Sequence, residues 1–260
     1  MIKLIPAKLL GSCVRLITSI SYPKFLVRFL CNSFAKKYNI DTSILSKNLD
    51  EYYSLLDFFI REPADGARPI CQGKNEIASP VDALVTAIGS ASENKIILVK
   101  NNLTSLDDLI QNDFSNYING KFIMLYLSPG DFHRIYSPAD GTVLRSWFID
   151  GKLWPVFPAF TDKNPDTFCK NKRVITELDS ASGKILIVKV GAMNVGRIPV
   201  KHSLPYSPNE NKHYKKGEEI GRFEFGSTVI LLFEKDKFTL DSNLSLGCKV
   251  KIGEKIATTV

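Results

Sequence analysis

The sequence has few of the side chains that bind metal ions or form disulfides. Its 260 residues include three histidines, His133, His202 and His213, which are too dispersed to form a metal-binding pattern. The five cysteines are odd in number and form no close pair; they are Cys13, Cys31, Cys71, Cys169 and Cys248. We therefore predict no metal site and no disulfide framework. We expect the cysteines to be small apolar core residues in a reducing compartment.

Long apolar runs are also missing. In residues 1–38 a lysine or arginine interrupts the apolar residues every several positions. A membrane-spanning helix needs about 20 predominantly apolar residues, so this segment does not predict one. No sustained apolar stretch ends in a small-residue cleavage site, so we expect no cleaved signal peptide. The apolar residues recur at helical spacings instead, which predicts amphipathic helices.

Acidic residues are absent before Asp41, and the net charge of the whole chain is +7. The basic residues of this segment are Lys3, Lys8, Arg15, Lys24, Arg28, Lys36 and Lys37. We expect no nucleic-acid partner, because the aromatic residues do not interleave with the basic ones as a stacking platform requires. Two interpretations stay open. The segment is a helical layer packed on the protein's own core, or a helix in the membrane interface with its basic face toward anionic head groups.

Residue 70 divides the sequence into two regions of different character. Residues 1–70 form the helical region, with a further helix predicted over 41–60 and a turn-rich exit over 61–70. Residues 71–260 contain short β-branched runs at 84–88, 95–99, 122–127, 141–148, 174–178, 184–190 and 229–233. A short helix over 104–110 is predicted to be capped by Thr104. We predict an α+β fold with N-terminal amphipathic helices packed on a mostly β, barrel-like or sandwich-like body.

A short motif occurs twice in the β region. Ser79-Pro-Val-Asp82 and Ser137-Pro-Ala-Asp140 share a Ser-Pro-x-Asp pattern, and each leads into a predicted strand. Two late glycine turns, at 216–221 and 252–256, also resemble each other. Repeated strand-turn units of this kind are typical of small closed or sandwiched β structures.

A serine follows a glycine directly before the last long β run, at Gly226-Ser227-Thr228. Glycine has no Cβ, so Ser227 Oγ can approach the carbonyl carbon of Gly226, and the peptide bond between them is a candidate for attack by its own neighbour. The same tripeptide is also common in ordinary turns, so by itself it is a weak signal.

The longest distinctive stretch is Tyr126-Leu-Ser-Pro-Gly-Asp-Phe-His-Arg-Ile-Tyr-Ser-Pro-Ala-Asp-Gly-Thr-Val143. Together with Ser79 to Asp82, Phe58 to Pro69 and Phe225 to Val229, it resembles the phosphatidylserine decarboxylase family of self-cleaving proenzymes. The resemblance spans nearly the whole chain, with the motifs in the expected order.

The resemblance implies a carboxy-lyase that makes its own cofactor. Ser227 attacks the carbonyl of Gly226, the amide becomes an ester, and β-elimination leaves a large chain, 1–226, and a small chain, 227–260. The small chain then begins with a pyruvoyl group derived from Ser227. Its ketone forms a Schiff base with phosphatidylserine and accepts the electron pair left by carbon dioxide, giving phosphatidylethanolamine. Another aminoacyl lipid as substrate is left open, as is acyl-chain preference.

The family assigns an aspartate and a histidine to help the serine, and Asp82 matches the aspartate. Relatives carry two histidines three residues apart, the second as the base and the first near the decarboxylation step. Here the first is His133, the second position is Tyr136, and a neutral phenol is a poor base. Three interpretations stay open: His133 serves both steps, Tyr136 is ionised by its surroundings, or the enzyme is diminished. We favour the first. Without the resemblance, Asp82 would be expected only to close a turn, as Asp140 does.

The partners follow from the same resemblance. We expect phosphatidylserine in an anionic membrane as substrate, a peripheral location on the cytoplasmic face of the cell membrane, and large and small chains that stay associated. A homodimer is left open. Arg134 and Arg197 are candidate anion contacts. The alternative from another class is an uncleaved, membrane-docked β binding module, in which the glycine turns are scaffold.

Overall fold

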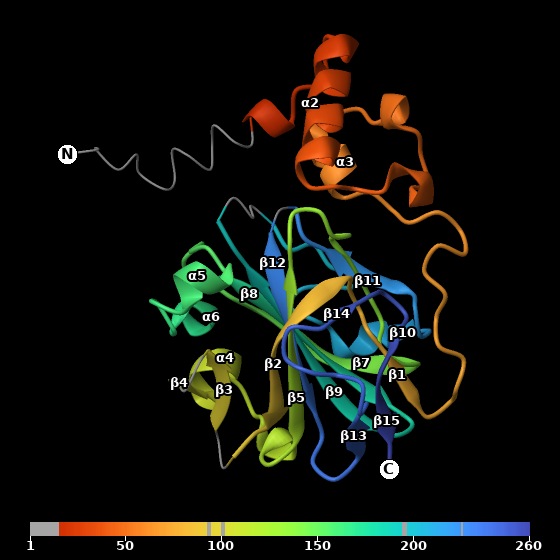
Figure 1. Ribbon diagram of the computed structural model, residues 1–260. Helices are drawn as coiled ribbons and strands as arrows, with labels where there is room; N and C mark the ends of the chain where they lie inside the picture. The colour runs from red at the N-terminus through yellow and green to blue at the C-terminus, as the bar shows by residue number, and fades with distance from the viewer. Residues whose placement is uncertain (1–15, 93–94, 100–101, 194–196, 225) are drawn as a thin grey trace, which may run out of the picture.

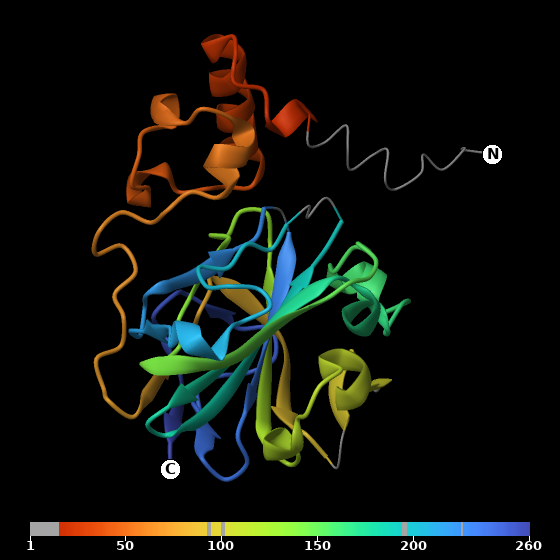
Figure 2. The ribbon, with the colours of Figure 1, turned by 180° about the vertical axis from the view of Figure 1, so that it is seen from behind.

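The structure is a computed structural model that describes residues 16–92, 95–99, 102–193, 197–224 and 226–260. Figure 1 shows a small helical region at one end of a larger β body, and Figure 2 shows the same arrangement from behind. The prediction of a mostly β body with few helices is confirmed.

An antiparallel sheet of eight strands forms the centre of the body, in the order β10-β7-β8-β9-β12-β5-β2-β14. In that order, the strands are His213–Tyr214, Gly141–Ile149, Arg173–Ser180, Gly183–Gly191, Ser227–Phe233, Lys121–Leu127, Ala83–Ser90 and Lys249–Val250. All seven β-branched runs predicted from the sequence lie in strands. Every residue of the central strand β12 is buried, which explains its unbroken apolar run.

Three smaller sheets and several short helices complete the body. The sheets are β1 (Glu76–Ala78) with β15 (Lys255–Thr259) and β13 (Phe238–Leu240), β11 (Glu219–Arg222) with β6 (Arg134–Tyr136), and β3 (Lys95–Val99) with β4 (Asn102–Ser105). The helices are α4 (Leu106–Ile110), α5 (Pro158–Thr161), α6 (Thr167–Lys170), η3 (Ser115–Tyr117) and η4 (Pro208–Glu210). The helix predicted over 104–110 is α4, but its cap is Ser105, whose side chain accepts a hydrogen bond from the Asp107 amide.

The helical region contains one long helix, α2 (Lys24–Lys37), and part of the predicted helical segment 1–38 is thereby confirmed. Its buried residues Val27, Cys31 and Ala35 belong to a small core that also contains Phe132 and Ile252 of the body. The part of this segment before residue 16 lies outside the described residues. In the described part of the chain, every helix is too short or too polar to cross a bilayer. The division of the chain at residue 70 stays a prediction.

The continuous helix predicted over 41–60 is wrong. That segment forms η1 (Thr42–Ile44), η2 (Leu49–Glu51) and α3 (Leu55–Phe59). Asp41 and Ser54 precede η1 and α3, and each side chain accepts a hydrogen bond from a backbone amide of the turn that follows. At η2, the Asn48 amide donates a hydrogen bond of 2.6 Å to the Glu51 carboxylate. Short polar side chains that bind nearby amides start new turns and compete with a continuous helix.

The repeated Ser-Pro-x-Asp motif forms the same turn twice. In each turn the serine Oγ, of Ser79 or Ser137, donates a hydrogen bond of 2.7 Å to the carbonyl oxygen two residues later. The carbonyl oxygens of these serines accept hydrogen bonds from the amides of Gly253 and Gly217, respectively. The two glycines have φ of +86° and +82°, a left-handed conformation that favours glycine. The late glycine turns are therefore the docking partners of the repeated motif.

Candidate functional site

Ser227 is the first residue of β12 and lies in the middle of the central sheet. It pairs with Leu127 of β5 on one side and with Gly191 of β9 on the other. Its side chain is fully buried, and Oγ has no hydrogen-bond partner in the described part of the chain. A buried hydroxyl without a partner costs free energy, but the hydroxyls of Tyr52, Thr86 and Thr228 share this state. What distinguishes Ser227 is its position directly after Gly226.

His133 also has a buried polar atom without a partner. Its Nδ1 donates to the carbonyl oxygen of Asp131 at 2.9 Å, which fixes the tautomer and leaves Nε2 as the acceptor nitrogen. Nε2 is buried and has no hydrogen-bond partner among the described residues. Burial, and next the positive charge of Arg61, lower the pKa of His133 to about 3, so the imidazole is neutral at pH 7.

The backbone brings His133 and Ser227 into one neighbourhood. Leu127 pairs with Ser227, and the carbonyl oxygen of His133 accepts a hydrogen bond of 2.9 Å from the Phe223 amide. The loop between Leu127 and His133 therefore lies opposite the short segment between Phe223 and Ser227. Because the two free side-chain atoms both lack partners, they are not hydrogen-bonded to each other in this uncleaved chain.

The helical region covers this neighbourhood. The ring of Phe59, in α3, lies on the imidazole of His133, with the ring centroids 4.0 Å apart. In Figures 1 and 2 the helical region lies at the end of the body where β12 begins. The site is thus closed by the region that carries α2 and α3.

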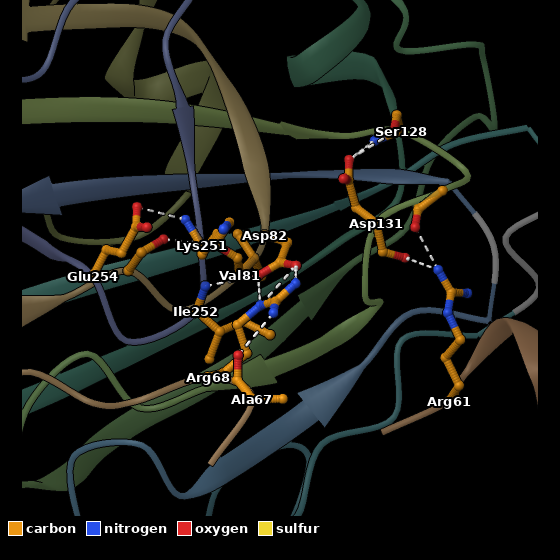
Figure 3. Close-up of polar contacts among 12 residues, drawn as sticks. Arg61, Ala67, Arg68, Val81, Asp82, Ser128, Asp131, Lys251, Ile252 and Glu254 are labelled. Carbon is orange, nitrogen blue, oxygen red and sulfur yellow. Dashed lines mark hydrogen bonds and ion pairs between the residues drawn. The ribbon is translucent and has the colours of Figure 1, made fainter. Parts of the chain in front are cut away.

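Asp82 is held by an arginine and does not contact His133 through a hydrogen bond. Its carboxylate accepts from Arg68 Nε at 2.9 Å and from Nη2 at 2.6 Å, and it also accepts from the Ile252 amide at 2.8 Å (Figure 3). Asp140, in the matching turn, likewise accepts a hydrogen bond of 2.7 Å from a backbone amide, that of Lys216. Each aspartate therefore binds the glycine turn that docks on its motif, not an amide of its own turn, and Asp82 in addition binds Arg68.

A second arginine, Arg61, anchors the histidine loop. It is 2% exposed, and its Nη2 donates to the carbonyl oxygens of Gly130 and Asp131 (Figure 3). The Asp131 carboxylate accepts hydrogen bonds of 2.7 Å from both the amide and the hydroxyl of Ser128. These contacts connect the end of α3 with the loop before His133 and hold the imidazole in place.

Tyr136 lies in β6, and its amide donates to the Pro80 carbonyl at 2.9 Å. Burial raises the pKa of its phenol to about 12, and the nearby Arg134 opposes that shift only in part. The phenol is therefore neutral at pH 7, which counts against the interpretation in which Tyr136 is ionised by its surroundings.

Comparison with known proteins gives the same family as the motifs. The phosphatidylserine decarboxylase family model matches residues 55–258. The chain belongs to the phosphatidylserine decarboxylase family. Phosphatidylserine decarboxylase proenzymes of Geobacillus sp. (strain WCH70) and Anoxybacillus flavithermus are each 42% identical to it, over 89% and 88% of this chain and 87% and 84% of theirs. That of Myxococcus xanthus is 33% identical over 98% of this chain and 96% of its own.

Two arginines of this member of the phosphatidylserine decarboxylase family were not expected from the sequence to bind site residues. Arg61 binds the loop before His133, and Arg68 binds Asp82. Arg61 and Arg68 lie in the quoted motifs, but the residues they bind are far along the chain, so no local pattern reveals the pairing. The expected anion contact Arg134 is instead held between Glu62 at 2.6 Å and Glu219 at 2.7 Å. Arg197 is exposed and forms no ion pair with any described residue.

Gly226 has more room than the sequence suggests. A Cβ at this position would meet no atom within 4 Å, and its φ is outside the left-handed range. In the uncleaved chain, neither crowding nor a strained φ requires glycine. The missing side chain of Gly226 would instead keep its carbonyl carbon accessible to the attacking oxygen of Ser227.

Proposed function

We propose that this chain is a phosphatidylserine decarboxylase proenzyme that cleaves itself between Gly226 and Ser227. Family membership supports the activity, because the relatives described above are phosphatidylserine decarboxylase proenzymes. One structural observation supports the cleavage site: Ser227 Oγ is buried without a partner, directly after Gly226.

His133 is the base that this geometry favours for the first step. Ser227 Oγ transfers its proton to His133 Nε2 as the oxygen attacks the carbonyl carbon of Gly226. The bond from that carbon to the Ser227 nitrogen then breaks, and the nitrogen receives the proton from His133. The product is an ester between Gly226 and Ser227 Oγ. The neutral imidazole has a fixed tautomer that leaves Nε2 free to accept the proton, and the transfer requires the two side chains to approach each other. Burial and Arg61 lower its pKa to about 3, so it is a weak base in the uncleaved chain.

The pyruvoyl group implied by the family fits the position of Ser227. Elimination from the ester, followed by hydrolysis with one water and loss of ammonia, would leave this group at the start of a chain of residues 227–260. When present, it accepts a substrate amine and takes up the electron pair released with carbon dioxide. The burial of Ser227 would limit the access of bulk water. His133 would supply a proton to the product only after Nε2 has taken one up, because the neutral imidazole carries its proton on Nδ1.

The substrate membrane is contacted by α2 in this proposal. Phe25 and Phe29, four residues apart, are 75% and 64% exposed, and Tyr22 just before the helix is 83% exposed. Lys24 and Arg28 are on the same helix. Exposed aromatic side chains beside basic ones are typical of a helix that lies in the interface of an anionic membrane. We infer a peripheral location on the cytoplasmic face, with phosphatidylserine as the substrate.

The intact mass of the purified full-length protein tests the proposal. We expect two chains, one ending at Gly226 and one made of residues 227–260 that lacks an ammonia. Ser227→Ala should remain a single chain and release no carbon dioxide from phosphatidylserine. A folded wild-type protein that stays uncut would overturn self-cleavage and favour the uncleaved binding module. A cleaved protein that decarboxylates a different aminoacyl lipid would correct the substrate alone.

A further inference from the structure

An apolar groove with two cations lies over β7 and β8 of the central sheet. It has a volume of about 310 Å³, and its walls include Phe148, Val174 and Leu204 together with the cationic residues Lys172 and Arg197. Phe148 and Leu204 are 49% and 39% exposed, so a ligand could cover apolar area here. Its lining contains no carboxylate.

The groove lies on the face of the central sheet that carries Ser227. Val174 pairs with Lys189 of β9, and Lys189 pairs with Val229 of β12. Side chains of directly paired residues point to the same face, and so do residues two apart in a strand. Val174, Val229 and Ser227 therefore share a face. Since neighbouring strands are about 4.8 Å apart, β8 lies about 10 Å from β12.

Lys172 lies in the same row across the sheet as Ser227. Its carbonyl oxygen accepts a hydrogen bond of 2.9 Å from the Gly191 amide, and Gly191 pairs with Ser227. The ion pair between Lys172 and Asp150 is long, at 3.5 Å, and Asp150 is 77% exposed, so it would be replaced easily by a ligand anion. Arg197 forms no ion pair with a described residue. Two cations thus line the groove, and one of them, Lys172, lies in the row of Ser227.

Resting on the proposed function, we infer that this groove binds the glycerophosphate and the first part of an acyl chain of the aminophospholipid substrate. Lys172 and Arg197 bind the phosphodiester oxygens, and the apolar walls at Phe148, Val174 and Leu204 cover the start of the chain. In a serine head group, only a few bonds separate the amine from the phosphodiester. The amine therefore stays close to the phosphate that these two long cationic side chains hold. Because Ser227 is fully buried, the amine reaches position 227 only when the residues that cover it move.

The protein carries a built-in reporter for this groove. Its two tryptophans are Trp147 and Trp154, the immediate neighbours of the lining residues Phe148 and Leu153. The titration would use full-length Ser227→Ala protein, which stays uncleaved, and dihexanoyl phosphatidylglycerol below its micelle concentration. This lipid has the phosphodiester and acyl chains but no amine to react. We expect a saturable change in tryptophan fluorescence.

Variants of the groove should weaken this binding. Leu204→Asn and the double variant Lys172→Met/Arg197→Met are each expected to raise Kd at least fivefold, and all three positions are accessible enough for the fold to survive. The matched control is Leu246→Asn, since Leu246 is 70% exposed and outside the groove lining. It should leave Kd unchanged. No saturable change, or equal affinity in all variants, would overturn the proposal.

The same variants with Ser227 intact separate this inference from the proposed function. Intact mass reports cleavage whether or not the groove binds lipid. In cleaved protein, Leu204→Asn should lower the kcat/KM ratio between dihexanoyl phosphatidylserine and glycerophosphoserine, which lacks acyl chains. If the groove instead packs against a second copy of the chain, light scattering would show a changed oligomeric state in Leu204→Asn with unaltered lipid affinity. That result would also overturn the inference.

Discussion

The carbonyl oxygen of Asp131 accepts hydrogen bonds from both His133 Nδ1, at 2.9 Å, and Arg61 Nη2, at 3.0 Å. One backbone oxygen thereby connects the candidate base to a buried arginine of the helical region. The arrangement fixes which imidazole nitrogen is free, and it explains how a single histidine can be aligned without a carboxylate partner.

His133→Gln should slow cleavage at least about 100-fold, because general-base catalysis contributes roughly 10²–10⁴ to a rate. The fraction of cut chain would be followed by intact mass during synthesis in a cell-free system. The amide of glutamine keeps polar atoms in the buried site, so a folded but uncut product is expected. Cleavage at the wild-type rate would remove His133 from the mechanism.

Tyr136→Phe is the control for His133→Gln, and its cleavage rate should stay within about threefold of the wild-type rate. The reason is that burial raises the pKa of the Tyr136 phenol to about 12, so it is not ionised at pH 7 and contributes little as a base. The same time course measures it. A block in this variant, with the protein still folded, would show that the phenol itself takes part.

Breaking the pair between Arg68 and Asp82 should destabilise the fold. The two side chains are 11% and 9% exposed, and removing one partner of a buried pair costs about 3 kcal/mol. Urea unfolding of Asp82→Asn in the uncleaved Ser227→Ala background would measure this loss. Asp140→Asn is the control, because the carboxylate it replaces accepts an exposed hydrogen bond from the Lys216 amide. Equal loss in both variants would contradict a special role for the arginine pair.

Lys189 should make stability depend on pH. It is fully buried in β9, its Nζ donates to Thr176 Oγ1 at 2.7 Å, and burial lowers its pKa from 10.5 to about 7. Between these values the unfolded chain binds more protons, so stability rises with pH from 7 to 10.5. The contribution is about 3 to 5 kcal/mol, since one pKa unit corresponds to about 1.4 kcal/mol.

The contribution of Lys189 to the free energy of unfolding is isolated by comparing two uncleaved proteins. One is Ser227→Ala, and the other is Ser227→Ala/Lys189→Met. The methionine variant should be the more stable of the two at pH 7, and the difference should shrink as the pH approaches 10. Urea unfolding at several pH values gives both curves. Parallel curves would mean that Lys189 does not lose its proton in the folded protein.

Phe25→Ser/Phe29→Ser should weaken binding to anionic vesicles at least tenfold, because these side chains lose apolar area that would be buried in the interface. Cosedimentation with phosphatidylserine vesicles measures it. Tyr53→Ser is the control, since Tyr53 is 76% exposed in the same region but outside α2. Unchanged binding of the double variant would place the membrane contact elsewhere.

The sequence predicts the strands well. Each run such as 184–190 is rich in β-branched residues, so the local pattern is enough. Ser227 and His133 come from the family resemblance. The partners of Arg61 and Arg68 depend on how distant segments meet, and the sequence has no local sign of them. The segment 41–60 has helical spacing, yet its capping side chains divide it into separate turns.

The position of Ser227 also has a consequence for how the protein is assembled. Residues 227–260 supply β12, β13, β14 and β15, and β12 is bonded along its length to β5 and β9. While the chain is whole, insertion of β12 is intramolecular and benefits from a high effective concentration. Once the bond before Ser227 is cut, reassembly becomes a meeting of two molecules. The uncut chain therefore folds without having to find a second molecule. If the mature protein were denatured, its two chains would have to associate again before folding, so the refolding rate would depend on protein concentration.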